Sequence, residues 1–163
     1  MVRRLTTDAI LVALSLTMFL IEGLIAVPIL PPGAKLGLSN IVIVIALYYL
    51  TCADSLMILI SRILLSSIFV GSPSVILFSF VGGICSLIAM ILLKRSQMFS
   101  IFAVSTSGGF FHNFGQILVA YFLMDSLKII NYLTVLGICG ILTGLIIGFI
   151  SERILKIITQ QLC

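Results

Sequence analysis

Three ionisable side chains, Glu22, Arg62 and His112, stand inside long apolar stretches of the sequence. In hydrocarbon a charged side chain costs about 2.5 to 3.5 kcal/mol on insertion scales, so each such residue needs a partner or a water-filled cavity. Asn113 and Gln116 accompany the histidine, and because His112 and Gln116 are four residues apart they share one face of a helix. We therefore expect His112, Asn113 and Gln116 to form one wall that orients a polar ligand through charge and hydrogen bonds.

Two interpretations of this set stay open. In the first, Glu22 and Arg62 neutralise each other inside a helix bundle, and His112 donates to a backbone carbonyl. In the second, the polar groups converge on a pocket for a small ligand, and the cations Lys35 and Arg62 favour an anionic group on it. The candidate substrate-binding residues are Glu22, Lys35, Asn40, Arg62, His112, Asn113 and Gln116.

The residues needed for the common kinds of catalysis are missing. One histidine cannot build a multi-histidine metal site, and the four cysteines are scattered without the spacing of a zinc site or a disulfide framework. Asp8, Asp54 and Asp125 fall near membrane edges on separate segments, so no Ser-His-Asp triad can be assembled. The sequence also lacks an aspartate-rich cluster for magnesium and a phosphate-binding loop for ATP. We expect no enzyme, no metal and no cofactor.

Composition places these residues in a membrane. Of 163 residues 61% are hydrophobic and only 9% are charged, and the mean hydropathy is +1.37. A bilayer core of roughly 30 Å takes about 20 apolar residues per helix, so six spans use most of the chain and leave no room for a soluble domain. The formal charge of +4 serves membrane topology, and we expect a lipid bilayer and no nucleic acid as the surroundings.

Turn residues divide the chain into six helices of one integral membrane domain, residues 1–163. The predicted spans are residues 7–27, 38–50, 54–70, 74–93, 100–124 and 132–150, and the second is short for a full span. An N-inside, C-inside chain places six basic residues in the cytoplasm and two outside, in agreement with the positive-inside rule. The cytoplasmic set is Arg3, Arg4, Lys94, Arg95, Arg153 and Lys156, and the outer pair is Lys35 and Lys128. The predicted location is the cell membrane.

The first outer loop, residues 27–40, is rich in proline and glycine and is therefore stiff. We interpret it as a lid over a cavity lined by Glu22, Arg62 and His112 that opens to the outside. The alternative is a well-ordered connector without a ligand beneath it.

Small residues predict two packing faces. Gly140, Gly144 and Gly148 are four residues apart, so they form one flat helix face that another backbone can approach closely, and we expect that contact to be internal. Ala9 and Ala13 form a similar face near the cytoplasmic end of the first helix. That face serves either internal packing or the docking of another membrane subunit.

Several blocks of the sequence together resemble the Gx transporter family, which is often labelled heptaprenyl diphosphate synthase component I. They are the run Pro32-Gly-Ala-Lys-Leu-Gly-Leu-Ser-Asn40, the segment from Arg62 through Gly71, the pair Gly82-Gly83, and His112-Asn-Phe-Gly-Gln116. The resemblance implies a six-helix protein similar to the substrate-binding S components of energy-coupling-factor (ECF) transporters, which capture a vitamin or a related small molecule. In that class an Ala-x-x-x-Ala face, matched here by Ala9 and Ala13, docks a transmembrane T subunit, and two ATPase subunits supply the energy.

Three hypotheses for the function follow. The first is an S subunit of an ECF-type importer that binds a small, vitamin-like or anionic metabolite from the outer side. The second is a non-catalytic membrane subunit that accompanies a polyprenyl diphosphate synthase or a quinone or electron-transfer assembly. The third, an intramembrane enzyme, is disfavoured by the missing catalytic set.

Overall fold

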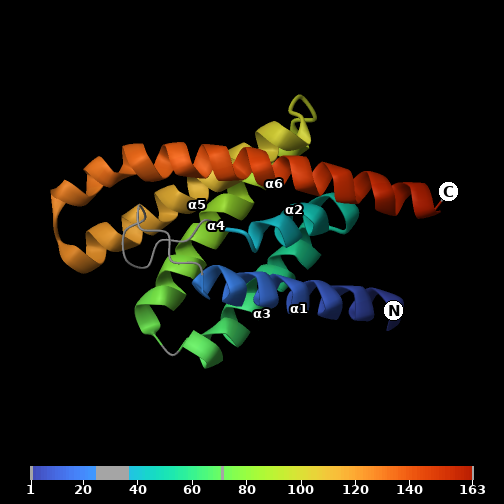
Figure 1. Ribbon diagram of the computed structural model, residues 1–163, viewed down its shortest axis with the longest axis horizontal. Helices are drawn as coiled ribbons and strands as arrows, with labels where there is room; N and C mark the ends of the chain where they lie inside the picture. The colour runs from blue at the N-terminus through green and yellow to red at the C-terminus, as the bar shows by residue number, and fades with distance from the viewer. Residues whose placement is uncertain (1, 25–36, 71, 163) are drawn as a thin grey trace.

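The computed structural model describes residues 2–24, 37–70 and 72–162, and within these ranges it contains helices and no strand (Figure 1). This confirms the predicted all-α class. The helices are α1 (Val2–Leu24), α2 (Asn40–Tyr49), α3 (Cys52–Val70), α4 (Pro73–Arg95), α5 (Ile101–Met124), the short 3-10 helix η1 (Leu127–Asn131) and α6 (Tyr132–Leu162).

Four of these helices are long and apolar enough to cross a membrane. They contain the stretches Arg4–Leu24, Cys52–Phe69, Pro73–Arg95 and Ile129–Gln160. Helix α2 has 10 residues, and α5 has 24 but carries the polar run around His112. The structure therefore supports a multi-pass membrane protein with six α-helices in the described residues, of which four are long and apolar enough to cross a membrane.

Two helices extend beyond their predicted bounds. Helix α1 begins at Val2 rather than at residue 7, and α6 continues to Leu162 rather than ending at residue 150. Residues 151–162 contain no proline or glycine to stop a helix, and Glu152 and Lys156 form an ion pair of 3.0 Å one turn apart. The extension is therefore a polar continuation of an apolar span.

Helix α2 lies at the centre of the bundle. It contacts α1, α3, α5 and α6, while α5 packs between α4 and α6 on one side and α1 packs against α3 on the other (Figure 1). Every residue from Asn40 to Leu47 is buried, and its apolar members are the middle of the hydrophobic core. The start of α2 is consequently enclosed by the other helices.

Both chain termini lie at the same end of the bundle (Figure 1). At the start of α1, Arg4 donates to both carboxylate oxygens of Asp54 at the start of α3, over 2.6 and 2.7 Å. Lys94 at the end of α4 donates to the carbonyl of Leu47 and stacks on Tyr48, with its Nζ 5.0 Å from the ring centroid. Arg4 and Lys94, two of the residues expected on the cytoplasmic side, thus tie the α2–α3 corner to its neighbours.

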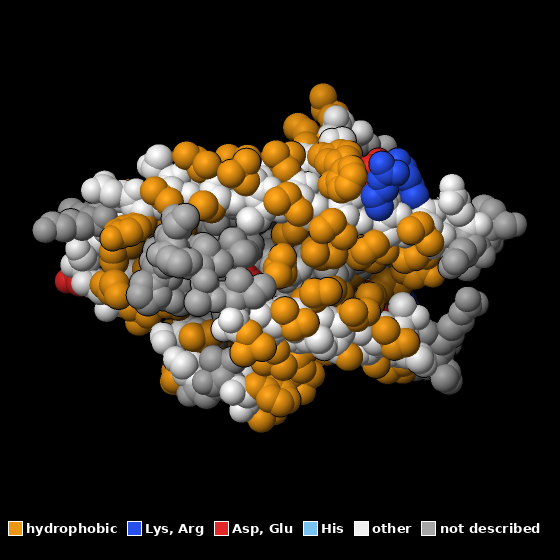
Figure 2. All heavy atoms as spheres, in the orientation of Figure 1, with side chains coloured by type: hydrophobic (Ala, Val, Ile, Leu, Met, Phe, Trp, Pro, Cys, Tyr) orange, Lys and Arg blue, Asp and Glu red, His pale blue; other side chains and the backbone are white. Residues whose placement is uncertain are grey.

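The surface is largely apolar. Figure 2 shows hydrophobic side chains spread across one face from end to end, with few charged side chains among them. Large side chains are exposed on the long helices, among them Leu24 at 86%, Ile68 at 76% and Phe122 at 79%. Such a surface is unfavourable in water and suits lipid, where helices satisfy their own backbone hydrogen bonds.

Glycines bring the backbones of α5 and α6 into direct contact. A Cβ added at Gly140 would lie 2.6 Å from the carbonyl oxygen of Gly109, and one at Gly144 would lie 2.7 Å from the Cα of Thr106. A Cβ at Gly148 would lie 3.1 Å from the Cα of Phe102. The glycine face of α6 therefore packs against α5, the helix that positions His112.

Candidate functional site

Glu22 holds the turn that leads into α2. The side chain is only 5% exposed, and its carboxylate accepts the backbone N–H of Gly37 and, over 3.1 Å, that of Leu38. Gly37 has φ of +85°, a left-handed conformation that favours glycine. A carboxylate on α1 thus fixes the turn that delivers Ser39 and Asn40 to the middle of the bundle.

Arg62 is a fully buried cation in the middle of α3. The side chain is 1% exposed, its Nη1 donates to the Ser39 hydroxyl over 3.0 Å, and its guanidinium carbon lies 5.5 Å from the centroid of the Phe19 ring. The negative charge of Glu22 acts on this guanidinium. Within the part of the chain that the structure describes, Nε and Nη2 of Arg62 are buried and have no hydrogen-bond partner.

On α5, His112 and Gln116 form a pair, with 3.0 Å between their Nε2 atoms. Both face α4, because a Cβ added at Gly82 would lie 3.2 Å from the His112 ring and from the Gln116 side chain. Asn113 faces α6 instead, where its Nδ2 donates to the carbonyl of Leu136 over 2.7 Å. The structure thus brings His112 and Gln116 together and places Asn113 on a different wall of the helix.

The turn before α2 joins these groups. A Cβ added at Gly37 would lie 2.9 Å from Asn40 Nδ2 and 3.8 Å from His112 Cδ2, so Gly37 sits between these two side chains. The same turn meets Glu22 from α1 and Arg62 from α3. We call this set the polar centre: Glu22, Gly37, Ser39, Asn40, Arg62, His112 and Gln116.

Sequence reasoning missed three members of this neighbourhood. Ser39, 2% exposed, is the hydrogen-bond partner of Arg62, and Phe19, also 2% exposed, is its aromatic neighbour. Gly37 is needed for both its conformation and its small size. The sequence signal that could have indicated Gly37 and Ser39 was their position, three residues and one residue before the predicted Asn40. Lys35, and most of the predicted lid, lie outside the described residues.

The polar centre offers one kind of chemistry. It supplies a guanidinium, a carboxylate, an imidazole and neutral amides that are buried from the surface and can bind and orient polar groups. Among the described residues there is no group of three or more His, Cys, Asp or Glu side chains that could hold a metal ion.

Residues 11–154 match the family described as heptaprenyl diphosphate synthase component I. The chain belongs to this family. None of the curated proteins and none of the solved structures compared with the chain matches it. The matched range contains the whole polar centre of this component I family member, and Ala9 lies just before it.

In this component I family member Ala9 and Ala13, the predicted docking residues, are exposed on α1. Exposed apolar neighbours such as Ile10 and Leu14 lie beside them. The exposed face of α1 therefore combines two small side chains with larger apolar ones.

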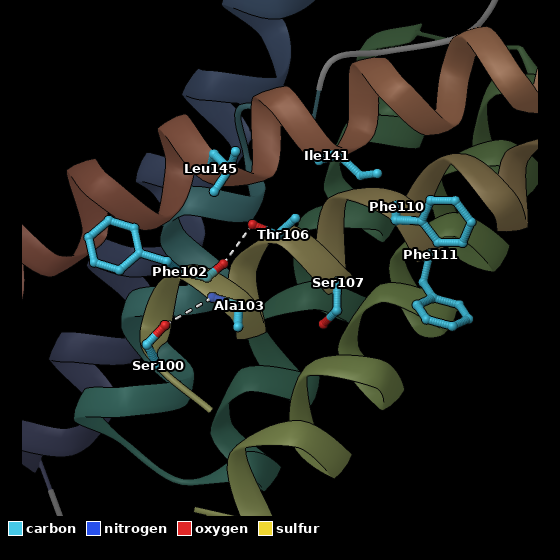
Figure 3. Close-up of a pocket in the computed structure, with 9 residues that line it drawn as sticks. All are labelled: Ser100, Phe102, Ala103, Thr106, Ser107, Phe110, Phe111, Ile141 and Leu145. Atoms are coloured by element: carbon cyan, nitrogen blue, oxygen red, sulfur yellow. Dashed lines mark hydrogen bonds between the residues drawn. The ribbon is translucent and has the colours of Figure 1, made fainter. Parts of the chain in front are cut away.

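The component I family member also carries a groove of about 580 Å³ between α5 and α6, which none of the predicted substrate-binding residues lines (Figure 3). Its polar atoms are engaged within α5: Thr106 donates to the carbonyl of Phe102 over 2.7 Å, and Ser100 accepts from the backbone of Ala103. The groove therefore presents apolar surface to its surroundings. Its lining residues are Ser100, Phe102, Ala103, Thr106, Ser107, Phe110, Phe111, Ile141 and Leu145.

Proposed function

We propose that this protein is the substrate-binding transmembrane subunit, or S component, of an ECF-type importer in the cell membrane. It captures a small polar metabolite, anionic or vitamin-like, from the outer side. The observation that carries this proposal is the polar centre, in which α1, α3 and α5 direct a carboxylate, a guanidinium and an imidazole at one turn.

Burial of these groups supports binding as their role. Glu22, Arg62, His112 and Gln116 are each 5% exposed or less, in a protein whose outer surface is apolar. Keeping ionic groups inside a membrane protein costs free energy, and such groups mark ligand or ion sites. A bundle needing only stability would gain as much from apolar side chains of similar volume.

The remaining parts of the proposal concern partners. The sequence has no phosphate-binding loop, so ATP-driven transport requires separate ATPase subunits. In an ECF-type assembly two ATPases act through a transmembrane T subunit. The exposed Ala9 and Ala13 are the residues we assign to docking it, because small residues allow helix backbones to approach closely in lipid.

The family description supports a second function. A chain in a family described as heptaprenyl diphosphate synthase component I is a candidate non-catalytic membrane subunit of a polyprenyl diphosphate synthase. A quinone or electron-transfer assembly is the related possibility. In either case the bound partner is a soluble enzyme or redox protein rather than ATPases with a T subunit.

Native mass spectrometry of the protein purified gently from its own membranes tests the two functions. The importer predicts a stoichiometric polar metabolite together with a T subunit and ATPases, whereas a polyprenyl lipid with a synthase or a redox partner supports the accessory subunit and overturns the importer. Arg62→Gln should lose the metabolite. Arg95→Gln, which removes an exposed arginine at the end of α4, should keep it.

A further inference from the structure

Arg62 presents an unused hydrogen-bonding edge inside the bundle. A guanidinium has five N–H donors in a fixed plane. In Arg62 the Nη1 atom donates to Ser39, while Nε and Nη2 are buried without a partner in the described part of the chain. The hydrogens of Nε and Nη2 lie in the guanidinium plane and point outward from the same edge. With this edge arginine binds the two oxygens of one carboxylate through parallel hydrogen bonds.

Neighbouring residues fix the orientation of this edge. Ser39 anchors the opposite corner of the guanidinium, and Phe19 lies against the group at 5.5 Å. Glu22 holds Gly37 and Leu38, the two residues before Ser39, and so fixes the anchor itself. The edge is therefore preorganised, and a ligand that meets it does not have to order a long flexible side chain.

Charge favours a monoanion at this edge. Glu22 accepts hydrogen bonds from two backbone N–H groups, as an ionised carboxylate does, and its negative charge offsets the positive charge of Arg62. A ligand carboxylate then leaves one net negative charge in a low-dielectric interior, whereas a phosphate dianion leaves two. Two buried donors without a partner are themselves costly, so an oxyanion that satisfies both gains free energy.

We propose that the Nε and Nη2 edge of Arg62 is the subsite for a carboxylate group of the transported ligand. Ser39 and Phe19 are positioning residues for this subsite. The inference rests on the proposed function and narrows the substrate class to carboxylic acids that place one carboxylate in the middle of the bundle.

The test observes the Arg62 Nε–H directly by ¹⁵N NMR of the full chain in lipid nanodiscs. The spectrum of Arg62→Lys assigns the signal by its disappearance. Propionate is the probe, and propionamide is its neutral control of the same shape. The subsite predicts a saturable shift of the Arg62 signal with propionate, none with propionamide, and weaker binding of inorganic phosphate. An equal response to propionamide, or no response to propionate, overturns the proposal, and tighter phosphate binding overturns the carboxylate assignment.

Two serine variants separate positioning from a general loss of structure. Ser39→Ala should weaken propionate binding about tenfold, because the guanidinium loses its anchor. Ser66→Ala removes a similarly buried hydroxyl on α3, one turn after Arg62. Among the described residues, the hydroxyl of Ser66 donates only to the carbonyl of Ile63 in its own helix. This variant should leave binding unchanged, and equal losses in both variants contradict the positioning role.

Failure of this subsite is distinguishable from failure of the importer. If a metabolite, a T subunit and ATPases co-purify while the Arg62 signal ignores propionate, the importer stands and the subsite falls. If propionate binds at Arg62 and a prenyl synthase co-purifies instead, the subsite stands and the importer falls.

Discussion

Glu22 accepts a hydrogen bond from the backbone N–H of Gly37, 15 residues further along the chain, and so links the end of α1 to the turn before α2. Two residues after Gly37, Ser39 receives the hydrogen bond of Arg62. The buried carboxylate and the buried guanidinium are thus connected through one turn of backbone. Changing either residue should disturb the other through this turn and through charge.

Glu22→Gln should lower the free energy of unfolding by about 3 kcal/mol, because it leaves Arg62 as a buried cation without its opposing charge. Unfolding in mixed micelles, followed by circular dichroism, measures the change. Glu152→Gln is the control: this partly exposed residue pairs with Lys156 on α6, and its loss should cost about 0.5 kcal/mol or less.

The double variant Glu22→Gln, Arg62→Gln should lose less free energy of unfolding than the sum of the losses in the two single variants, because neither buried charge is then left without the other. Simple additivity would mean that the two residues act independently. Circular dichroism under the same conditions provides this comparison.

Gly140→Ala should lower the free energy of unfolding by about 2 kcal/mol, because the new methyl group meets the Gly109 carbonyl on α5. Thermal unfolding in a mild detergent measures the loss. Gly23→Ala adds the same methyl group to α1 at a position with no atom of the described residues within 4 Å, and it should be neutral or stabilising. Similar losses in both variants would argue against close packing of α5 and α6.

Thr51→Ala should cost about 1 kcal/mol, because Thr51 caps α3. Its hydroxyl accepts from the backbone of Asp54 over 3.2 Å, and its own N–H donates to the Asp54 carboxylate over 3.1 Å. Thr51→Ser keeps both bonds and should keep stability.

Arg4→Gln should lower the free energy of unfolding by less than Thr51→Ala does, and the loss should fade with added salt, because the Arg4 side chain is 57% exposed. Chemical unfolding at low and high salt separates these contributions.

Ala13→Leu should leave stability unchanged but abolish co-purification of a T subunit, because Ala13 is exposed and leucine would keep a partner helix at a distance. Affinity purification from native membranes, with the partners identified by mass spectrometry, is the measurement. Ile138→Leu alters an exposed position on α6 and should keep the partner. Retention of the T subunit by Ala13→Leu would remove α1 from the docking surface.

Hydropathy and turn residues were sufficient to predict six helical segments, because apolar runs and proline or glycine punctuation act locally. The end of α6 was predicted too early because Glu152 and Arg153 leave the apolar pattern without stopping a helix. The site could be predicted only in its charged members. Ser39 and Phe19 are ordinary residue types that gain a role through contact with Arg62.

Asn113 illustrates a second limit. The prediction that His112, Asn113 and Gln116 form one wall is wrong for Asn113, because adjacent residues on a helix point about 100° apart. In the structure Asn113 donates a hydrogen bond to the Leu136 carbonyl on α6, and His112 faces α4. Which of two neighbouring polar residues faces the site depends on how α4, α5 and α6 pack.

The shortness of α2 has a consequence for how the protein is made. Ten helical residues span about 15 Å, half of a bilayer core, so α2 is too short to be inserted into the bilayer as an independent span. Its residues from Asn40 to Leu47 are enclosed by α1 and by α3, α5 and α6, which emerge from the ribosome after it. The polar turn before α2 therefore reaches its final place late in biosynthesis, once α5 and α6 have closed around it.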